Sequence, residues 1–129
     1  MPPLPSIHLA WSRKAHRYCR RRGRRRARSG FSDGSLPNNE LLPGPNGSFY
    51  GTTFAGGQNS CGTVYQLMPP AAHSNTWTKA ILHDFGGTQL NDGCSPSNFG
   101  LIPGSDGALY GATTSGGAGN AGTIYQLIP

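Results

Sequence analysis

The chain has 129 residues, and its 20 Gly and 11 Pro stand against only 12% charged residues. This composition favours turns, strands and loops and excludes a protein built from long helices. The formal charge of +6 is local, because ten of the eleven Lys and Arg residues lie between Arg13 and Arg28 and the other is Lys79. All five acidic residues come after residue 31, so the segment 31–129 carries one positive and five negative charges, a net −4.

Residues 1–30 form a basic tail that we expect to be disordered, because densely spaced like charges repel one another and bury too little surface to offset ordering entropy. The tail is not a secretory signal peptide, since its short, proline-broken apolar stretch precedes the positive charges instead of following them. No window of the chain approaches the roughly 18 apolar residues of a membrane-spanning helix. We therefore expect no membrane span.

Seven arginines of the tail support one functional hypothesis, the binding of nucleic acid or another polyanion by charge alone. They are Arg20, Arg21, Arg22, Arg24, Arg25, Arg26 and Arg28. The alternative is that residues 1–30 come from a mis-assigned start, because Arg, Ala, Gly and Pro are what GC-rich DNA yields when it is read upstream of the true start or out of frame. A charge run by itself carries low functional specificity, so we favour the second interpretation.

Residues 31–129 contain about 1.7 copies of one glycine-rich repeat, with copy 1 at 31–89 and a partial copy 2 at 90–129. At an offset of 60, residues 42–69 and 102–129 share 14 identities in 28 positions. The longest matched pieces are Tyr50-Gly51-x-Thr53 with Tyr110-Gly111-x-Thr113, and Gly62-Thr63-Val64-Tyr65-Gln66-Leu67 with Gly122-Thr123-Ile124-Tyr125-Gln126-Leu127. Upstream of Gly100 the offset is 59, so Asp33-Gly34 falls opposite Asp92-Gly93.

Four strands are expected per repeat, and in chain order the clearest signals are residues 77–85, 99–102, 108–114 and 123–128. Asn46-Gly47 and Asp106-Gly107 predict tight turns, because these dipeptides supply the positive φ angles that short turns demand. In the last two strands Leu109, Tyr125 and Leu127 alternate with Tyr110, Ile124 and Ile128, which are also apolar. This alternation predicts a sheet that is covered on both faces.

Antiparallel four-stranded sheets packed face to face on identical neighbours are the plan of β-propeller blades. We therefore predict an all-β fold of propeller-like blades: one whose strands run through residues 40–85, and an incomplete second that ends at Pro129 without its last partner strand. A blade is apolar on both faces and needs a neighbour on each. The expected partners are further repeat copies or self-association through blade faces, and the sequence specifies no small-molecule or glycan ligand.

The residues that define the repeat also resemble a known family. The pattern Asp/Asn-Gly-x-Leu/Phe-Tyr-Gly-x-Thr, then Gly-Gly, then Gly-Thr-Val/Ile-Tyr-x-Leu resembles the GloVer repeat, found in tandem in large bacterial proteins that are often exported or surface-anchored. The resemblance covers residues 31–129, including the Leu-His-Asp-Phe segment at 82–85. It implies an extracellular or cell-surface location and transfers no catalytic residue. The family's proteins usually carry many copies, and the basic tail matches nothing in it.

The chemical motifs in the chain predict no catalytic residue, metal ligand or cofactor site. Residues 117–122 fit G-x-G-x-x-G, but the following segment is a strand ending in Pro129, so no helix N-terminus is available for a pyrophosphate. His83 and Asp84 are adjacent on a strand and point to opposite faces, so they do not chelate one ion. The hydroxyls of Thr53, Thr113 and Ser115 have no His or carboxylate at a motif spacing.

Three cysteines remain, and their spacing is not that of a zinc site. Cys19 is expected to be free in the tail. Cys61, in a glycine loop, and Cys94, at a strand connection of the next copy, would form a disulfide at one rim if the chain is exported, or else stay as two unpaired thiols.

These observations favour a non-enzymatic β-repeat module, a fragment of an exported or cell-surface propeller-like protein with a structural or ligand-binding role. Polyanion binding through the tail is one alternative. A fragment of a propeller enzyme acting on glycans is the other, because a propeller mouth assembles its site from several blades.

Overall fold

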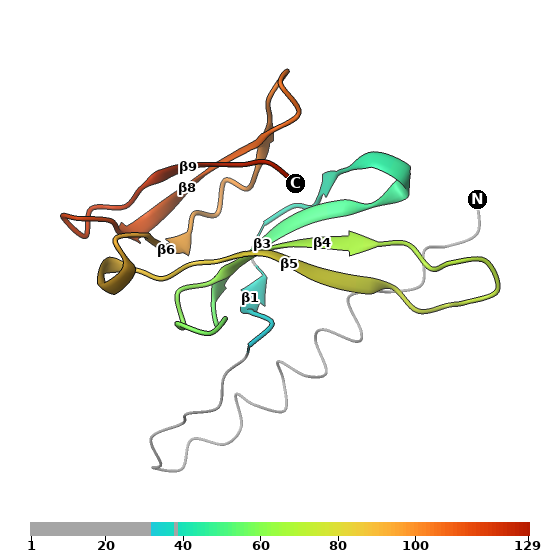
Figure 1. Cartoon of the computed structure of the whole chain (residues 1–129), viewed down its shortest axis with the longest axis horizontal. Coiled ribbons are helices and arrows are strands. Elements are labelled where there is room, and N and C mark those ends of the chain that lie inside the picture. Colours follow the sequence, from blue (N-terminus) through green and yellow to red (C-terminus); the bar gives the residue numbers. More distant parts are fainter. Residues whose placement is uncertain (1–31, 38) are drawn as a thin grey trace, which may run out of the picture.

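The computed structural model describes residues 32–37 and 39–129, and the tail for which disorder is predicted lies outside these residues. The described chain forms two antiparallel sheets (Figure 1). Sheet 1 contains β1 (Ser35–Pro37), β2 (Leu42–Pro43), β3 (Phe49–Ala55), β4 (Thr63–Met68) and β5 (Thr78–Asp84). Sheet 2 contains β6 (Gly93–Pro96), β7 (Ile102–Pro103), β8 (Leu109–Gly116) and β9 (Ile124–Leu127). With only the 3-10 turns η1 (Pro45–Gly47) and η2 (Thr88–Leu90) as helical elements of the described part, the all-β prediction is confirmed.

The two sheets repeat one strand pattern. In sheet 1, β1 pairs with the C-terminal half of β3 and β2 with its N-terminal half, so the two short strands act as one interrupted ribbon beside β3. β4 follows on the other side of β3, and β5 pairs with β4. In sheet 2, β6 and β7 flank β8 in the same way and β9 takes the place of β4. Among the described residues no strand continues sheet 2 beyond β9, whereas β5 fills that place in sheet 1.

The short strands β1 and β6 were not predicted. Of the strand expected at 99–102, only Ile102 lies in a strand, at the start of β7. Both missed strands end in a proline, and both contain a residue with positive φ, Leu36 at 55° and Ser95 at 56°. A positive φ interrupts the regular alternation of side chains on which strand prediction depends. The matching irregularities confirm the offset of 59 between the copies in this region.

The Asn-Gly and Asp-Gly turns differ in detail. Asn46 and Gly47 both have positive φ, 56° and 75°, as the sequence predicts. In copy 2 only Gly107 does, at 81°. There the Asp106 side chain stabilises the turn instead, since its carboxylate accepts a hydrogen bond from the Ala108 amide at 3.1 Å and one from the Tyr110 hydroxyl at 2.8 Å.

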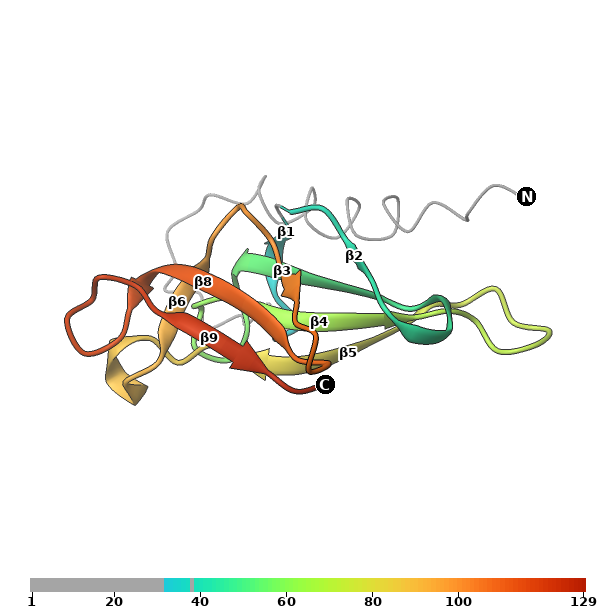
Figure 2. The ribbon, with the colours of Figure 1, turned by 90° about the horizontal axis from the view of Figure 1, so that it is seen from above.

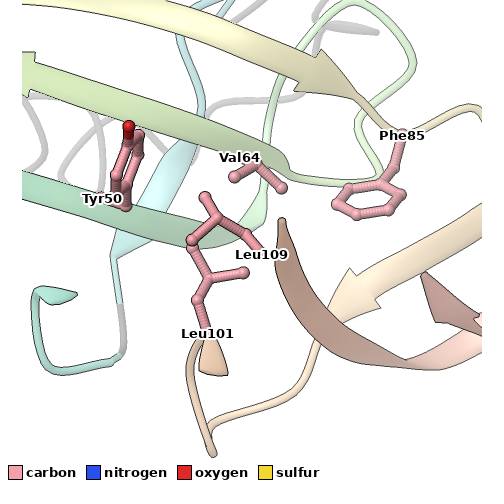
Figure 3. Packing of buried hydrophobic residues seen from close by; sticks show 5 residues of the cluster. All are labelled: Tyr50, Val64, Phe85, Leu101 and Leu109. Carbon is pink, nitrogen blue, oxygen red and sulfur yellow. The ribbon is translucent and has the colours of Figure 1, made fainter. Parts of the chain in front are cut away.

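The apolar core lies between the two sheets (Figure 3). Tyr50 and Val64 project from sheet 1 toward Leu101 and Leu109 of sheet 2, and each of the four is at most 8% exposed. Phe85, at the end of β5, is fully buried and packs edge-on against Tyr125 of β9, with ring centroids 5.0 Å apart. Viewed from above, β8 and β9 lie across β3, β4 and β5 (Figure 2).

The two sheets do not meet through equivalent faces. The face of sheet 1 that meets the core, its inner face, carries Tyr50 and Val64. Their counterparts Tyr110 and Ile124 lie on the outer face of sheet 2, turned away from the core, while Leu109 and Tyr125 form its inner face. The alternation of apolar residues predicts two faces suited to burial, and among the described residues only the inner face of sheet 2 is covered, since Ile124 is 87% exposed. The propeller assignment stays a prediction, since two sheets do not define a ring.

Candidate functional site: the junction between the two copies

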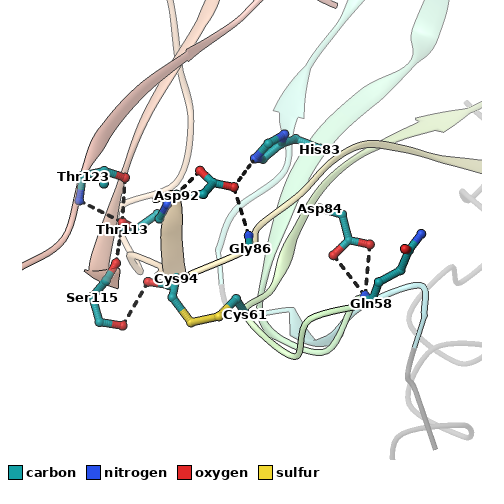
Figure 4. A network of polar contacts seen from close by, with 11 residues as sticks. Gln58, Cys61, His83, Asp84, Gly86, Asp92, Cys94, Thr113, Ser115 and Thr123 are labelled. Atoms are coloured by element: carbon teal, nitrogen blue, oxygen red, sulfur yellow. Dashed lines mark hydrogen bonds and ion pairs between the residues drawn. A yellow bond between two sulfur atoms is a disulfide. The ribbon is translucent and has the colours of Figure 1, made fainter. Parts of the chain in front are cut away.

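Cys61 and Cys94 join the two copies covalently in a disulfide, with their Cα atoms 4.5 Å apart (Figure 4). Cys61 lies in the glycine loop between β3 and β4 of sheet 1, and Cys94 lies in β6 of sheet 2. Beside the disulfide, the Ser95 amide donates a hydrogen bond to the Cys61 carbonyl at 2.8 Å. The glycine loop of copy 1 is thus tied to the first strand of copy 2.

The glycine loop has its shape because three glycines adopt conformations that other residues avoid. Gly56, Gly57 and Gly62 have φ of 78°, 81° and 89°, and the Gly62 amide donates to the Gly56 carbonyl at 2.8 Å. A Cβ atom on Gly62 would lie 2.2 Å from the Thr53 carbonyl oxygen, so no larger residue fits. Copy 2 repeats this geometry, since a Cβ on Gly122 would lie 2.3 Å from the Thr113 carbonyl oxygen.

A second link between the copies is polar. The Nε2 atom of His83, on β5, lies 2.9 Å from Oδ2 of Asp92, which precedes β6 (Figure 4). The Asp92 carboxylate also accepts hydrogen bonds from the amides of Gly86 at 2.9 Å and Gly93 at 2.7 Å. Partial burial opposes ionisation of Asp92, but these amides and His83 together outweigh it and lower the pKa of the carboxyl below 3.8. Asp92 therefore anchors the turn that leads from sheet 1 into sheet 2.

Asp84, the neighbour of His83, does not contact Asp92 but accepts a hydrogen bond within the first copy. Both of its carboxylate oxygens accept the Gln58 amide hydrogen, each at 3.0 Å (Figure 4). An open hollow of about 360 Å³ lies here, lined by Ser32, Gln58, Ile81, Leu82, His83 and Asp84. Within residues 32–37 and 39–129, no group of three His, Cys, Asp or Glu side chains is placed to hold a metal ion.

The two threonine hydroxyls considered as nucleophile candidates make the same internal contacts in both copies. Thr53 Oγ1 lies 3.0 Å from Thr63 Oγ1, and Thr113 Oγ1 lies 2.9 Å from Thr123 Oγ1. Each pair is completed by an amide, because the N–H of the second threonine donates to the hydroxyl of the first. Ser115 donates to the Cys94 carbonyl at 3.2 Å. Each of these hydroxyls fixes one strand against another.

The G-x-G-x-x-G segment at 117–122 returns the chain from β8 into β9. The residues after Gly122 form a strand, so no helix N-terminus faces the loop. The loop is therefore the copy 2 counterpart of the loop that holds Cys61.

The charged residues divide between the described sheets and the tail. The seven arginines of the polyanion hypothesis lie outside the described residues. Lys79, on the outer face of sheet 1, lies 3.5 Å from the Asp33 carboxylate and 5.3 Å from the centre of the Tyr65 ring. In the described part of the chain, no helix is long and apolar enough to cross a membrane.

The strand pattern, the glycine loops and the threonine pairs all recur at the spacing of one repeat, and residues 25–129 match the family model described as the Gloeobacter/Verrucomicrobia repeat. This chain belongs to the Gloeobacter/Verrucomicrobia repeat family. The match confirms the GloVer resemblance and extends it to residue 25. Comparison with curated proteins and with solved structures gave no match.

Two residues of the candidate site in this Gloeobacter/Verrucomicrobia repeat protein were not predicted from the sequence. Asp92 was noted only as part of the repeated Asp-Gly pair, although a carboxylate before a strand often accepts amide hydrogens of a turn. Gln58 contributes its backbone amide, which carries no sequence signal. The chain is thus a β-repeat module whose chemically distinctive side chains gather where one copy meets the next.

Proposed function

We propose that this chain is a non-catalytic module of an exported or cell-surface bacterial protein, in which stacked repeat copies provide a rigid structural or ligand-binding element. The observation that carries the proposal is the covalent junction between Cys61 and Cys94. Disulfides form and persist in oxidising compartments such as the periplasm and the cell surface, and they are rare in the cytosol. Family membership supports the structural part of the proposal, since both copies are packing units.

The use of polar side chains also supports a structural role. Thr53, Thr113, Asp84 and Asp92 each accept at least one backbone amide hydrogen. Groups engaged in this way hold turns and strands in place. If the module binds a ligand, the hollow at the end of β5, beside the junction, is the place we expect it to occupy.

Thiol trapping in the native cells tests the exported location. Cells that express the native gene are lysed in an alkylating agent without reductant, and the peptides that contain Cys61 and Cys94 are analysed by mass spectrometry. We expect both thiols to escape alkylation until a reductant is added. Full alkylation of both in the unreduced lysate would contradict the exported location.

A further inference from the structure

The outer face of sheet 2 is apolar and open. Ile102, Ile124 and Ile128 on this face are 65%, 87% and 79% exposed. Their counterparts in copy 1 are Leu42, Val64 and Met68, which are all less exposed. Leu42 and Val64 belong to the core between the two sheets.

The open face keeps the side-chain arrangement of the covered one. The Gln126 amide lies 2.9 Å from the Tyr110 hydroxyl, as the Gln66 amide lies 3.4 Å from the Tyr50 hydroxyl. The outer face of sheet 2 therefore has the side chains of a packing face. Its counterpart, the inner face of sheet 1, is covered by sheet 2, whereas the outer face of sheet 2 is open.

The chain itself indicates what covers such a face. On the inner face of sheet 2, Leu101, Leu109, Tyr125 and Leu127 pack against sheet 1. The same repeat positions in copy 1 hold Leu41, Phe49, Tyr65 and Leu67, all on the outer face of sheet 1. Three of these four positions have the same residue in both copies, and the fourth exchanges Phe for Leu.

The outer face of sheet 1 is only partly open, since Tyr65 and Leu67 are each 4% exposed while Leu41 and Ile81 are accessible. Leu41 is 37% exposed, whereas Leu101 is 8% exposed. Ile81 adds a further aliphatic side chain to this face at 36% exposure. Trp77 packs against Phe49, with ring centroids 6.0 Å apart, at the far end of β5.

We propose that the outer face of sheet 2 binds the outer face of sheet 1 of a second copy of this chain, repeating between molecules the contact that joins the two sheets within one. The proposal rests on the proposed function, because it assumes that the module acts through face packing. The contact joins different surfaces of the two molecules, so each bound chain leaves one surface free for the next. Head-to-tail contacts of this kind form rings or open filaments.

The proposed contact between molecules differs from the contact within the chain because it contains no matching pair of cysteines. The counterpart of Cys61 in copy 2 is Ala121, and the counterpart of Cys94 in copy 1 is Ser35. Strand pairing supports the second equivalence, because Ser35 lies opposite Ala55 as Cys94 lies opposite Ser115. The docked molecules would thus lack the disulfide. We expect the association to be reversible.

This difference provides the test. Two variants of the full chain are made in a Cys19→Ser background, one with Ser35→Cys and the other with Ala121→Cys. In a head-to-tail pair these cysteines meet as Cys61 and Cys94 do. An equimolar mixture of the two variants, oxidised and run on a non-reducing gel, should give at least five times more covalent dimer than either variant alone, with a 35–121 bridge by mass spectrometry.

Two controls make the outcome decisive. Adding Ile124→Asp to the Ala121→Cys chain should reduce the yield of mixed dimer at least tenfold, whereas adding Ala118→Asp, at an exposed loop position, should leave it unchanged. Equal yields from the mixture and the single variants, or a yield insensitive to Ile124→Asp, would overturn the proposal. Since the native Cys61–Cys94 disulfide is intact in every variant, such a failure would leave the exported, structural role standing.

Discussion

Val64 and Ile124 occupy the same place in the two copies of the repeat, 60 residues apart, yet Val64 is fully buried and Ile124 is 87% exposed. The difference arises because sheet 2 covers the face of sheet 1 that carries Val64, while nothing among the described residues covers the face that carries Ile124. Two similar aliphatic side chains thus occupy the same repeat position, one on a covered face and the other on an open face.

Val64→Ala should destabilise the fold by about 2 kcal/mol, because it leaves a cavity between the two sheets. Ile124→Ala should change the free energy of unfolding of the dilute monomer by less than about 0.5 kcal/mol, since an exposed side chain loses little burial. Urea denaturation of both variants at low micromolar concentration measures the difference. Similar losses for the two would mean that sheet 2 does not cover sheet 1 as described.

The disulfide gives a second prediction. Replacing both Cys61 and Cys94 by serine should lower the free energy of unfolding by roughly 3 to 4 kcal/mol on the chain-entropy model, given the sequence separation of 33 residues. Cys19→Ser is the matched control and should leave stability unchanged. Thermal unfolding of the three proteins under non-reducing conditions is the measurement, and a reductant should bring the parent to the level of the double variant. No effect of the reductant would contradict the prediction.

The repeat, the all-β class and the apolar positions were predictable from the sequence, because identities such as Tyr65 with Tyr125 and the two Gly-Thr steps recur at a fixed spacing. The sequence also placed the strand at residues 77–85 correctly at the end of the first sheet, where β5 pairs with β4. These features depend on local periodicity and turn chemistry, which a single chain displays.

The junction was less predictable. The contact between His83 and Asp92 joins an edge strand to a turn, and only the packing of one sheet on the other brings them together. The sequence predicts that a blade without a neighbour leaves an apolar face open, but it does not show which face of sheet 2 that is. Apolar residues on both sides of a strand indicate which faces are suited to burial, and the number of copies present decides which faces are actually buried.

Asp92 should make stability depend on acid pH. Its pKa is lowered in the folded state, so its contribution is fully present above the ordinary carboxyl pKa of 3.8 and is lost as the pH falls through the lower folded value. Asp92→Asn should reduce stability by about 1 kcal/mol at pH 7 and flatten the acid limb of the stability profile. Asp33→Asn, at the equivalent but exposed position in copy 1, is the control, and an equal effect there would contradict the anchoring role of Asp92.

The basic tail gives a prediction that separates the two functional hypotheses. Deleting residues 1–30 should abolish retention on heparin or DNA, because counterion release needs clustered cations and residues 31–129 contain only Lys79. The circular dichroism spectrum of the remainder should keep its β character. Retention of DNA by the truncated chain with a steep salt dependence would show that binding does not reside in the tail.

The glycine loop gives the last prediction, with a control inside the same chain. Gly62→Ala should destabilise the protein by about 2 to 4 kcal/mol, because the residue has a φ of 89° and a Cβ atom would lie 2.2 Å from the Thr53 carbonyl oxygen. Gly119→Ala, in the corresponding loop of copy 2, places its Cβ where no other atom lies within 4 Å and should have almost no effect. Gly62→Ala should also expose Cys61, because the loop that holds this residue against Cys94 depends on the hydrogen bond from the Gly62 amide to the Gly56 carbonyl. Denaturation curves combined with the rate at which a reductant opens the disulfide measure both effects. If Gly62→Ala were less stable but its disulfide opened no faster than that of Gly119→Ala, the loop would not be what shields the junction between the copies.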